Sequence, residues 1–215
     1  MPKSIKIANG QGFWGDSVDA PVKLIKNSSL DYLTLDYLAE VTMAIMQKQY
    51  NRDSKAGFAS DFVLFVENHF NKIIDNNIKI ITNAGGVNPH RCAKEIKNVS
   101  NNKLKIAVIE GDNILDQIHE YIDSGIQFQN LDTGESINKI KDSICSANIY
   151  IDSFIVSEAL FGNPDIIKKE FGGYGCSEGK LVLNFMGRKT FGVCFNKKAL
   201  NSIFGHCPDQ SQIGY

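Results

Sequence analysis

The stretch "IKIITNAGGVNPHRCA" (78–93) contains the three parts of an α/β unit in order. Its first five residues, "IKIIT", are apolar enough to predict a strand that is buried on both faces of a sheet. The glycine pair in "NAGGV" predicts a loop. Asn88 and Pro89 predict the start of a helix, because asparagine is a favoured N-cap and proline is favoured in the first turn. A buried strand that passes through a loop into a helix is typical of parallel α/β proteins.

The same alternation of strand and helix runs along most of the chain. The helix predicted for 56–77 is the clearest, because Phe62, Val66 and Phe70 recur every four residues. Residues 147–167 predict a polar turn, a short helix and the beginning of another strand. The remaining predicted elements are strands within 4–9, 30–39 and 103–112, and helices within 16–27, 39–50, 89–98 and 113–125.

This order of elements predicts the fold class. Alternating strands and helices imply parallel strands joined by right-handed crossovers. We therefore predict an α/β fold over residues 1–167: an open, layered domain with a mostly parallel sheet and helices on both faces. Residues 168–215 are predicted to form a divergent tail whose structure the sequence does not define. An open sheet edge would favour self-association, so a homo-oligomer is compatible with this fold.

The composition excludes several classes of protein. The chain has 215 residues, 43% of them hydrophobic, which is enough for a core. The net charge is −1 and no basic face stands out, so neither nucleic acid nor a membrane is an expected partner. The start lacks the apolar stretch of a signal peptide, and the five cysteines form no C-x-x-C pair. We therefore predict a cytoplasmic protein, and the sequence identifies neither a cofactor nor a metal.

A glycine-rich loop follows the first predicted strand. Gly10, Gly12 and Gly15 in "GQGFWGD" form the pattern G-x-G-x-x-G, and Asp36 lies where a dinucleotide-binding fold places an acid. In that fold the helix begins within the pattern and its N-terminus faces the pyrophosphate. Here the best helix caps follow Gly15, and Asp16 would bring a carboxylate toward the phosphates. An NAD(P)-binding oxidoreductase therefore remains only an alternative.

Small and acidic residues follow the predicted strands, and in a parallel sheet these positions meet at the carboxyl edge. We predict a small-molecule site there. The acids could supply a general base or bind a divalent cation, and the loop around Asn83 could offer N–H groups to an anion. Trp14 could either stack on a ligand or cover the core beneath its loop. The candidate catalytic residues are Asp36, Glu110 and Asp112. The candidate ligand-binding residues are Gly10, Gly12, Phe13, Trp14, Gly15, Asp16, Tyr37, Glu40, Asn83, Gly85, Gly86, Asn88, Gly111 and Asn148.

These motifs together resemble the N-terminal part of the acyclic terpene utilisation family over residues 4–167. The motifs that carry the resemblance are "GQGFWGD", "LDYLTLDYLAEVTMAIM", "AGFASDFV", "TNAGGVNPHRCA", "VIEGDNI" and "SANIYIDSFIVSEALFGNPDII". The resemblance implies that the first glycine loop belongs to this family rather than to a nicotinamide fingerprint. Members are associated with bacterial breakdown of acyclic terpenes such as citronellol and geraniol through acyl-CoA intermediates. No catalytic residue with an assigned role can be carried over.

After "PDII" the sequence departs from the family pattern, so we expect a domain that is shortened relative to the family. The resemblance implies an acyl or acyl-CoA type ligand and a role in acyclic isoprenoid catabolism. The reaction type, and whether the chain is an enzyme, stay undefined at this point. The alternatives are a non-catalytic binding or assembly module, a truncated remnant of an enzyme, and the oxidoreductase named above.

Overall fold

The computed structural model describes residues 5–27, 29–149, 156, 159–160, 165–169, 180–185 and 190–194. Contacts divide the chain into two compact units. The first unit comprises Met1–Gly111 and Ser153–Phe171, and the second comprises Asp112–Asp152 and Gly172–Tyr215. The predicted boundary at residue 167 between a domain and a tail stays a prediction.

The described part of the first unit contains a five-stranded parallel sheet with the strand order β1-β2-β3-β6-β4. The predicted fold class, an open α/β domain with a parallel sheet, is therefore confirmed. The strands are β1 (Ile7–Gln11), β2 (Tyr32–Leu35), β3 (Lys79–Thr82), β4 (Ile106–Ile109) and β6 (Ile166–Lys169). The helices are α1 (Asp19–Asn27), α2 (Glu40–Arg52), α3 (Ser60–Asp75) and α4 (Pro89–Val99).

Strand β6 lies between β3 and β4, although it follows them by many residues in the chain. Ile166 pairs with Ile80 on one side and with Ile106 on the other. The strand that "PDII" predicts is therefore present. Its position shows that β3 and β4, which are consecutive in the sequence, are not neighbours in the sheet.

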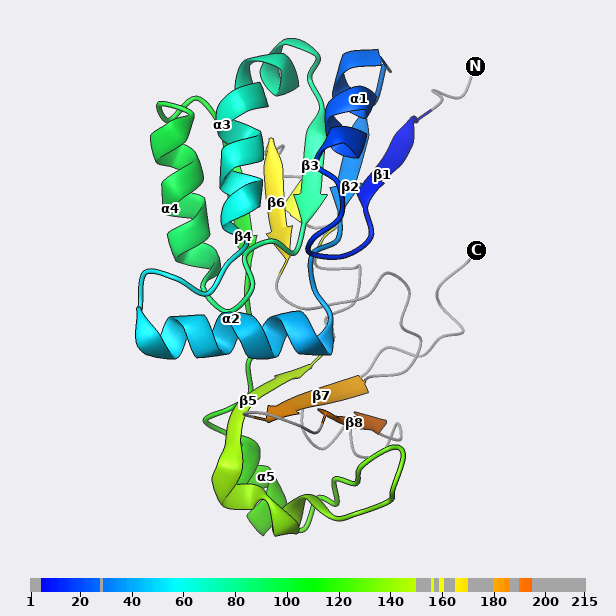
Figure 1. Ribbon diagram of the computed structural model, residues 1–215, viewed down its shortest axis with the longest axis vertical. Helices are drawn as coiled ribbons and strands as arrows, with labels where there is room; N and C mark the ends of the chain where they lie inside the picture. Colours follow the sequence, from blue (N-terminus) through cyan, green and yellow to red (C-terminus); the bar gives the residue numbers. More distant parts are fainter. Residues whose placement is uncertain are drawn as a thin grey trace. The chain divides into compact units, whose positions relative to one another are not determined.

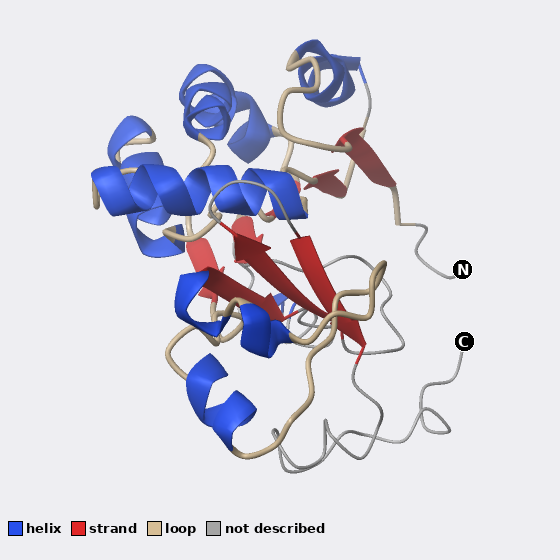
Figure 2. Ribbon diagram, turned by 60° about the horizontal axis from the view of Figure 1, so that its bottom comes forward, coloured by secondary structure: helices blue, strands red, loops and turns tan. Residues whose placement is uncertain are grey.

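The two faces of this sheet are covered by different helices. Ile80 and Ile166 pack with Phe62, Phe65 and other residues of α1, α3 and α4 in the main core, and these three helices lie side by side on one face of the sheet (Figure 1). Ile81 and Ile109 point to the opposite face, where they pack with the helical residue Val156. Because neighbouring strand residues point to opposite faces, the apolar runs of β3 and β4 serve both layers. Figure 2 shows the helices and strands from another side, coloured by type.

The second unit contains an antiparallel sheet with the order β5-β7-β8 in its described part. Its apolar cluster contains Ile114, Ile118 and Phe128, and Ala147 of β5 packs into it. The elements of this unit are α5 (Ile118–Asp123), the short 3-10 turns η1 (Ile137–Lys139) and η2 (Lys141–Ser143), and the strands β5 (Ile144–Ile149), β7 (Lys180–Phe185) and β8 (Thr190–Cys194).

Three predictions of local structure need correction. The polar turn predicted at the start of 147–167 is wrong, because Ala147, Asn148 and Ile149 belong to β5. The helix predicted for 113–125 is reduced to α5, because a turn and the isolated bridge between Asn113 and Asn148 precede it. The first helix begins at Asp19 instead of residue 16, since the residues before it close the glycine loop.

Candidate functional site

The first glycine loop connects β1 to α1 and is closed by its own carboxylate. Asp16 Oδ2 accepts hydrogen bonds from the backbone N–H groups of Gly12 at 2.8 Å and Phe13 at 3.2 Å. A dinucleotide-binding loop presents such N–H groups to the pyrophosphate. Here these two donors already hold a carboxylate of the chain itself, so the loop is occupied where a phosphate would bind.

The glycines of this loop serve packing and backbone geometry. A Cβ on Gly10 would lie 3.0 Å from both Leu35 Cδ2 and Pro21 Cβ, so Gly10 allows β1, β2 and α1 to pack closely. Gly15 has φ = 111°, a conformation that favours glycine. Phe13 is 54% exposed at the surface of the loop.

Trp14 covers the core beneath the loop. Its side chain packs against the main core, and its Nε1 donates a 3.0 Å hydrogen bond to Asp61 Oδ1 in the first turn of α3. Trp14 therefore packs on the core beneath its loop in this structure, and its predicted contact with a ligand stays a prediction. Asp61 was not among the predicted site residues, although it lies within the family motif "AGFASDFV".

Asp36 and Asn83 join the carboxyl ends of β2 and β3. Asn83 Nδ2 donates to Asp36 Oδ1 at 2.6 Å, and Asn83 Oδ1 accepts the backbone N–H of Tyr37 at 2.7 Å. The backbone N–H of Asp36 donates to the carbonyl oxygen of Gln11 at 3.1 Å, which links the end of β1 to the same group. Three neighbouring strand ends are thus connected through polar groups, as their parallel order requires.

Tyr37 points away from this polar group and into the core. It is 1% exposed and meets the ring of Phe62 edge-on at a centroid distance of 5.8 Å. Burial raises the pKa of the Tyr37 hydroxyl, and the nearby Asp61 and Cys92 raise it further. The ring therefore lies within the core in this structure, and its predicted contact with a ligand stays a prediction. Glu40, another predicted contact, is the first residue of α2.

The second glycine loop, between β3 and α4, is packed tightly against the loop between α2 and α3. Gly86 has φ = 53°, and a Cβ there would lie 2.7 Å from the carbonyl oxygen of Gly57. A Cβ on Gly85 would lie 2.8 Å from Pro89 Cβ. The Val87 N–H donates to Gly57 O at 2.9 Å. Gly86 therefore permits contact between the two loops, and Gly85 permits the close approach of Pro89 at the start of α4, so both glycines have a packing role.

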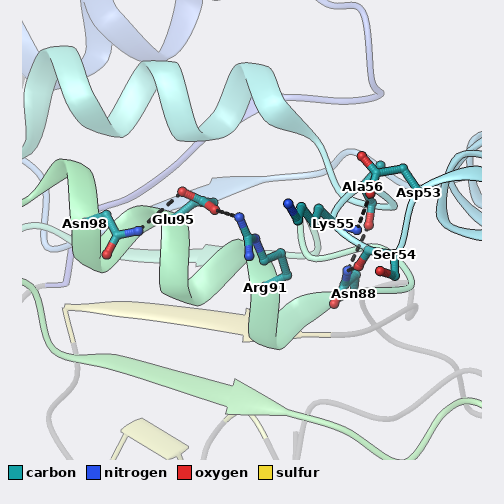
Figure 3. Close-up of polar contacts among 8 residues, drawn as sticks. All are labelled: Asp53, Ser54, Lys55, Ala56, Asn88, Arg91, Glu95 and Asn98. Carbon is teal, nitrogen blue, oxygen red and sulfur yellow. Dashed lines mark hydrogen bonds and ion pairs between the residues drawn. The ribbon is translucent and has the colours of Figure 1, made fainter.

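Asn88 occupies the N-cap position of α4, as predicted, but its side chain does not cap the helix. Its Nδ2 instead donates to the carbonyl oxygens of Ser54 at 3.0 Å and Ala56 at 2.8 Å (Figure 3). Further along α4, Arg91 forms an ion pair with Glu95, four residues on. Asn88 is therefore a structural tie between the same two loops.

Glu110 follows β4 and pairs with His90, which was not among the candidate site residues. Glu110 Oε1 lies 2.7 Å from His90 Nε2, and both side chains are more than half exposed, at 52% and 69%. Gly111 follows with φ = 113°. His90 lies in the first turn of α4, twenty positions before its partner, so no local motif indicates the pair.

Asp112 and Asn148 lie in the second unit and bind one another. Asn148 Nδ2 donates to Asp112 Oδ2 at 3.0 Å, and both residues are buried. The backbone N–H of Ile149 also donates to Asp112 O, at 2.8 Å. Of the three candidate catalytic acids, Asp36 and Glu110 therefore belong to the parallel sheet, whereas Asp112 supports β5.

Gln11, the last residue of β1, was also not among the predicted residues. It is 3% exposed, its Nε2 donates to Phe13 O at 3.1 Å, and its Oε1 has no hydrogen-bond partner among the described residues. The signal that could have indicated it is a polar residue between two glycines at a strand end. Such a residue is too far from the next helix to act as its N-cap, and it lies at the sheet edge where ligands bind.

Other features of the described residues bear on the class of site. No group of three or more His, Cys, Asp or Glu side chains in this part of the chain is arranged to hold a metal. No helix within the described ranges is long and apolar enough to cross a membrane. A hollow of about 560 Å³ is lined by residues that include Lys6, Ser29 and Asp31, which lie at the amino ends of β1 and β2. This hollow is therefore not at the carboxyl edge.

The fold and the edge geometry define an open α/β protein in which polar groups meet at the carboxyl ends of parallel strands. Residues 5–167 match the model of the family described as "Acyclic terpene utilisation family protein AtuA". The chain belongs to this family. Neither the curated proteins nor the solved structures contain a match to the chain.

Proposed function

We propose that the chain binds a small acyl compound, free or as its CoA thioester, at the carboxyl edge of the parallel sheet. The observation that carries this proposal is the group formed by Gln11, Asp36 and Asn83, which joins the ends of three neighbouring strands. Ligands of open α/β sheets bind outside these strand ends. Membership of the acyclic terpene utilisation family supports a role in the breakdown of acyclic isoprenoids.

Asp36 and Glu110 are the acids proposed to contact the ligand. Asp36 is half-buried and is held in place through Oδ1 by Asn83 and by the N–H of Leu38. Glu110 is exposed and is held by His90. Each acid is thus oriented by a neighbour while part of its carboxylate stays available, which suits a binding or proton-transfer role.

Equilibrium dialysis with isotope-labelled isovaleryl-CoA tests the proposal. Asp36→Asn and Glu110→Gln remove a charge and keep an oxygen acceptor, so both variants should fold. Each should weaken binding by about tenfold, the effect of one hydrogen bond to a charged group. Asp75→Asn and Glu67→Gln are matched controls, because both acids are exposed on α3 away from the edge. Equal affinity of all five proteins would refute the proposed site.

A non-catalytic binding module is a second candidate, and one observation favours it. Asp16 and Asp36 both bind groups of the chain itself, so each has a structural task. Release of labelled acid or of a modified acyl group by the purified chain would exclude this candidate. Binding without turnover would favour it. The oxidoreductase alternative has less support, since Asp16 occupies the N–H groups that would hold a pyrophosphate.

A further inference from the structure

Several backbone donors in the two glycine loops of the carboxyl edge already bind oxygens of the chain. In the first loop, Asp16 takes the N–H groups of Gly12 and Phe13. In the second loop, the N–H groups of residues 84 and 86–88 bind oxygens of the chain at 2.9–3.2 Å. Six of the backbone N–H groups that an anion could use in these two loops are therefore already engaged.

Two side-chain acceptors at the ends of β1 and β2 take no further partner among the described residues, and one of them is buried. Gln11 Oε1 is buried and takes no hydrogen bond from the described residues, while Nε2 of the same amide is engaged with Phe13 O. A buried acceptor without a partner is costly and uncommon in a folded protein. The amide orientation is fixed by its donor bond, since only the nitrogen can donate to a carbonyl oxygen.

Asp36 adds a second acceptor beside Gln11. Its Oδ1 accepts Asn83 Nδ2 at 2.6 Å and the N–H of Leu38 at 3.2 Å. Its Oδ2 accepts no hydrogen bond from the described residues. The bond from Asp36 N to Gln11 O, at 3.1 Å, holds the two residues at adjacent strand ends. An amide oxygen and a carboxylate oxygen thus lie on neighbouring strands.

We propose that Gln11 and Asp36 recognise a hydrogen-bond donor on the ligand, either a hydroxyl or an amide N–H, in a part of the ligand that carries no negative charge. The inference rests on the proposed function and narrows it, because it selects acyl compounds that carry such a donor. A carboxylate or phosphate would face two acceptors, one of them charged, and would be repelled. A donor satisfies the buried oxygen of Gln11 and the second oxygen of Asp36.

The buried state of Gln11 Oε1 sets a condition for binding. The oxygen is covered in the ligand-free chain, so a ligand reaches it only with a local rearrangement at the end of β1. The amide is tied to the first glycine loop through Phe13 O, so this loop should respond when the ligand binds. The response gives a local signal that a distant binding event would not produce.

The experiment is a titration of the ¹⁵N-labelled full chain with matched small probes, followed by amide chemical shifts. Acetamide is compared with N,N-dimethylacetamide, and 2-propanol with acetone, because each pair differs in its donor. Acetate and inorganic phosphate test whether the site accepts an anion. Acetamide or 2-propanol should shift the Gln11 side-chain amide and the backbone N–H of Asp36. The probe without a donor should bind about fivefold more weakly, the loss of one hydrogen bond. If acetamide binds more tightly than 2-propanol, the ligand presents an amide N–H; the reverse order indicates a hydroxyl.

Gln11→Met removes both polar atoms at nearly constant size, and Gln49→Met is the matched control on the exposed side of α2. Gln11→Met should abolish the shift at Asp36, and the control should leave it unchanged. If Gln11→Met does not fold, the probe pairs on the wild-type chain still decide. Equal binding within each pair, preferential binding of acetate or phosphate, or no shift at Gln11 with any probe would overturn the inference. Dialysis with isovaleryl-CoA is independent of these results, so the proposed function can stand when the inference fails.

Discussion

Replacing Gly86 with alanine is expected to destabilise the first unit through a defined steric conflict. Gly86 has φ = 53°, where an alanine is strained by about 1–2 kcal/mol. Its Cβ would also fall within contact distance of Met46 Sδ and 2.7 Å from Gly57 O. Met46 is a flexible side chain, but Gly57 O is backbone and is held by the Val87 N–H at 2.9 Å. Overpacking of this kind adds about 1–3 kcal/mol, so the expected total is roughly 2–5 kcal/mol.

Asn77→Ala separates the two contributions. Asn77 has φ = 51° and is exposed, so alanine at this position meets the same backbone strain without the crowding. Urea unfolding is monitored by fluorescence of Trp14, the one tryptophan of the chain, which packs on the core of the first unit. A stability loss in Gly86→Ala within about 0.5 kcal/mol of the loss in Asn77→Ala would refute the steric argument.

A double variant tests the same contact in another way. Met46→Ala alone removes a fully buried side chain and should lose about 2–5 kcal/mol. It also removes one of the two obstacles to a side chain at residue 86. Combining Met46→Ala with Gly86→Ala should therefore lose less stability than the sum of the single variants. Strict additivity would show that Met46 and the new Cβ do not meet.

Three further predictions concern single side chains. Asp61→Ala should lose about 1–2 kcal/mol of stability and shift the emission of Trp14 to the red. Asp61→Asn keeps the acceptor and should behave like the wild type. Equal urea midpoints of Asp61→Ala and the wild type would contradict a stabilising role of this bond. Burial lowers the pKa of His69, so the unfolded chain binds its proton first and stability falls as the pH decreases through the unfolded value of about 6.5. His69→Gln should flatten this slope in unfolding measured between pH 7.5 and about 5, and an unchanged slope would exclude His69 as its source. Asn83→Ala should lose roughly 2–4 kcal/mol of stability, because Asp36 and the backbone N–H of Tyr37 lose their partner. A loss smaller than about 0.5 kcal/mol would show that these two bonds do not hold the strand ends together.

The parts of the fold that local signals define were predictable from the sequence. The apolar run at residues 78–82 became β3, and Asn88 with Pro89 marked the start of α4. The spacing of Phe62 and Val66 placed one face of α3 in the core. These signals depend on a few neighbouring residues, so they survive in the folded chain.

Features that depend on distant residues were not predictable. The insertion of β6 between β3 and β4 follows from pairing between Ile80 and Ile166, and no local pattern encodes it. The polar residues of β5 resembled a turn, because Ser146 and Asn148 are buried polar groups in a short strand. Their burial is a tertiary effect that overrides local propensity.

The candidate site shows the same division. Parallel strands brought the end of β2 to the end of β3, so the proximity of Asp36 and Asn83 followed from the predicted order. The tasks of the glycines did not follow, because Gly86 is needed for a contact with Gly57 from another loop. The pairing of His90 with Glu110 likewise joins two elements that no motif connects.

The late position of β6 in the chain has a consequence for synthesis on the ribosome. When β3 and β4 have emerged, β4 lacks the neighbour with which it pairs in the described sheet, and β3 lacks one of its two neighbours. At roughly 5–20 residues per second, the ribosome needs about 3–12 s to extend the nascent chain from Ile109 to Lys169. During this interval two apolar strands expose unpaired backbone, which makes the emerging polypeptide a substrate for chaperones and vulnerable to pairing with another copy.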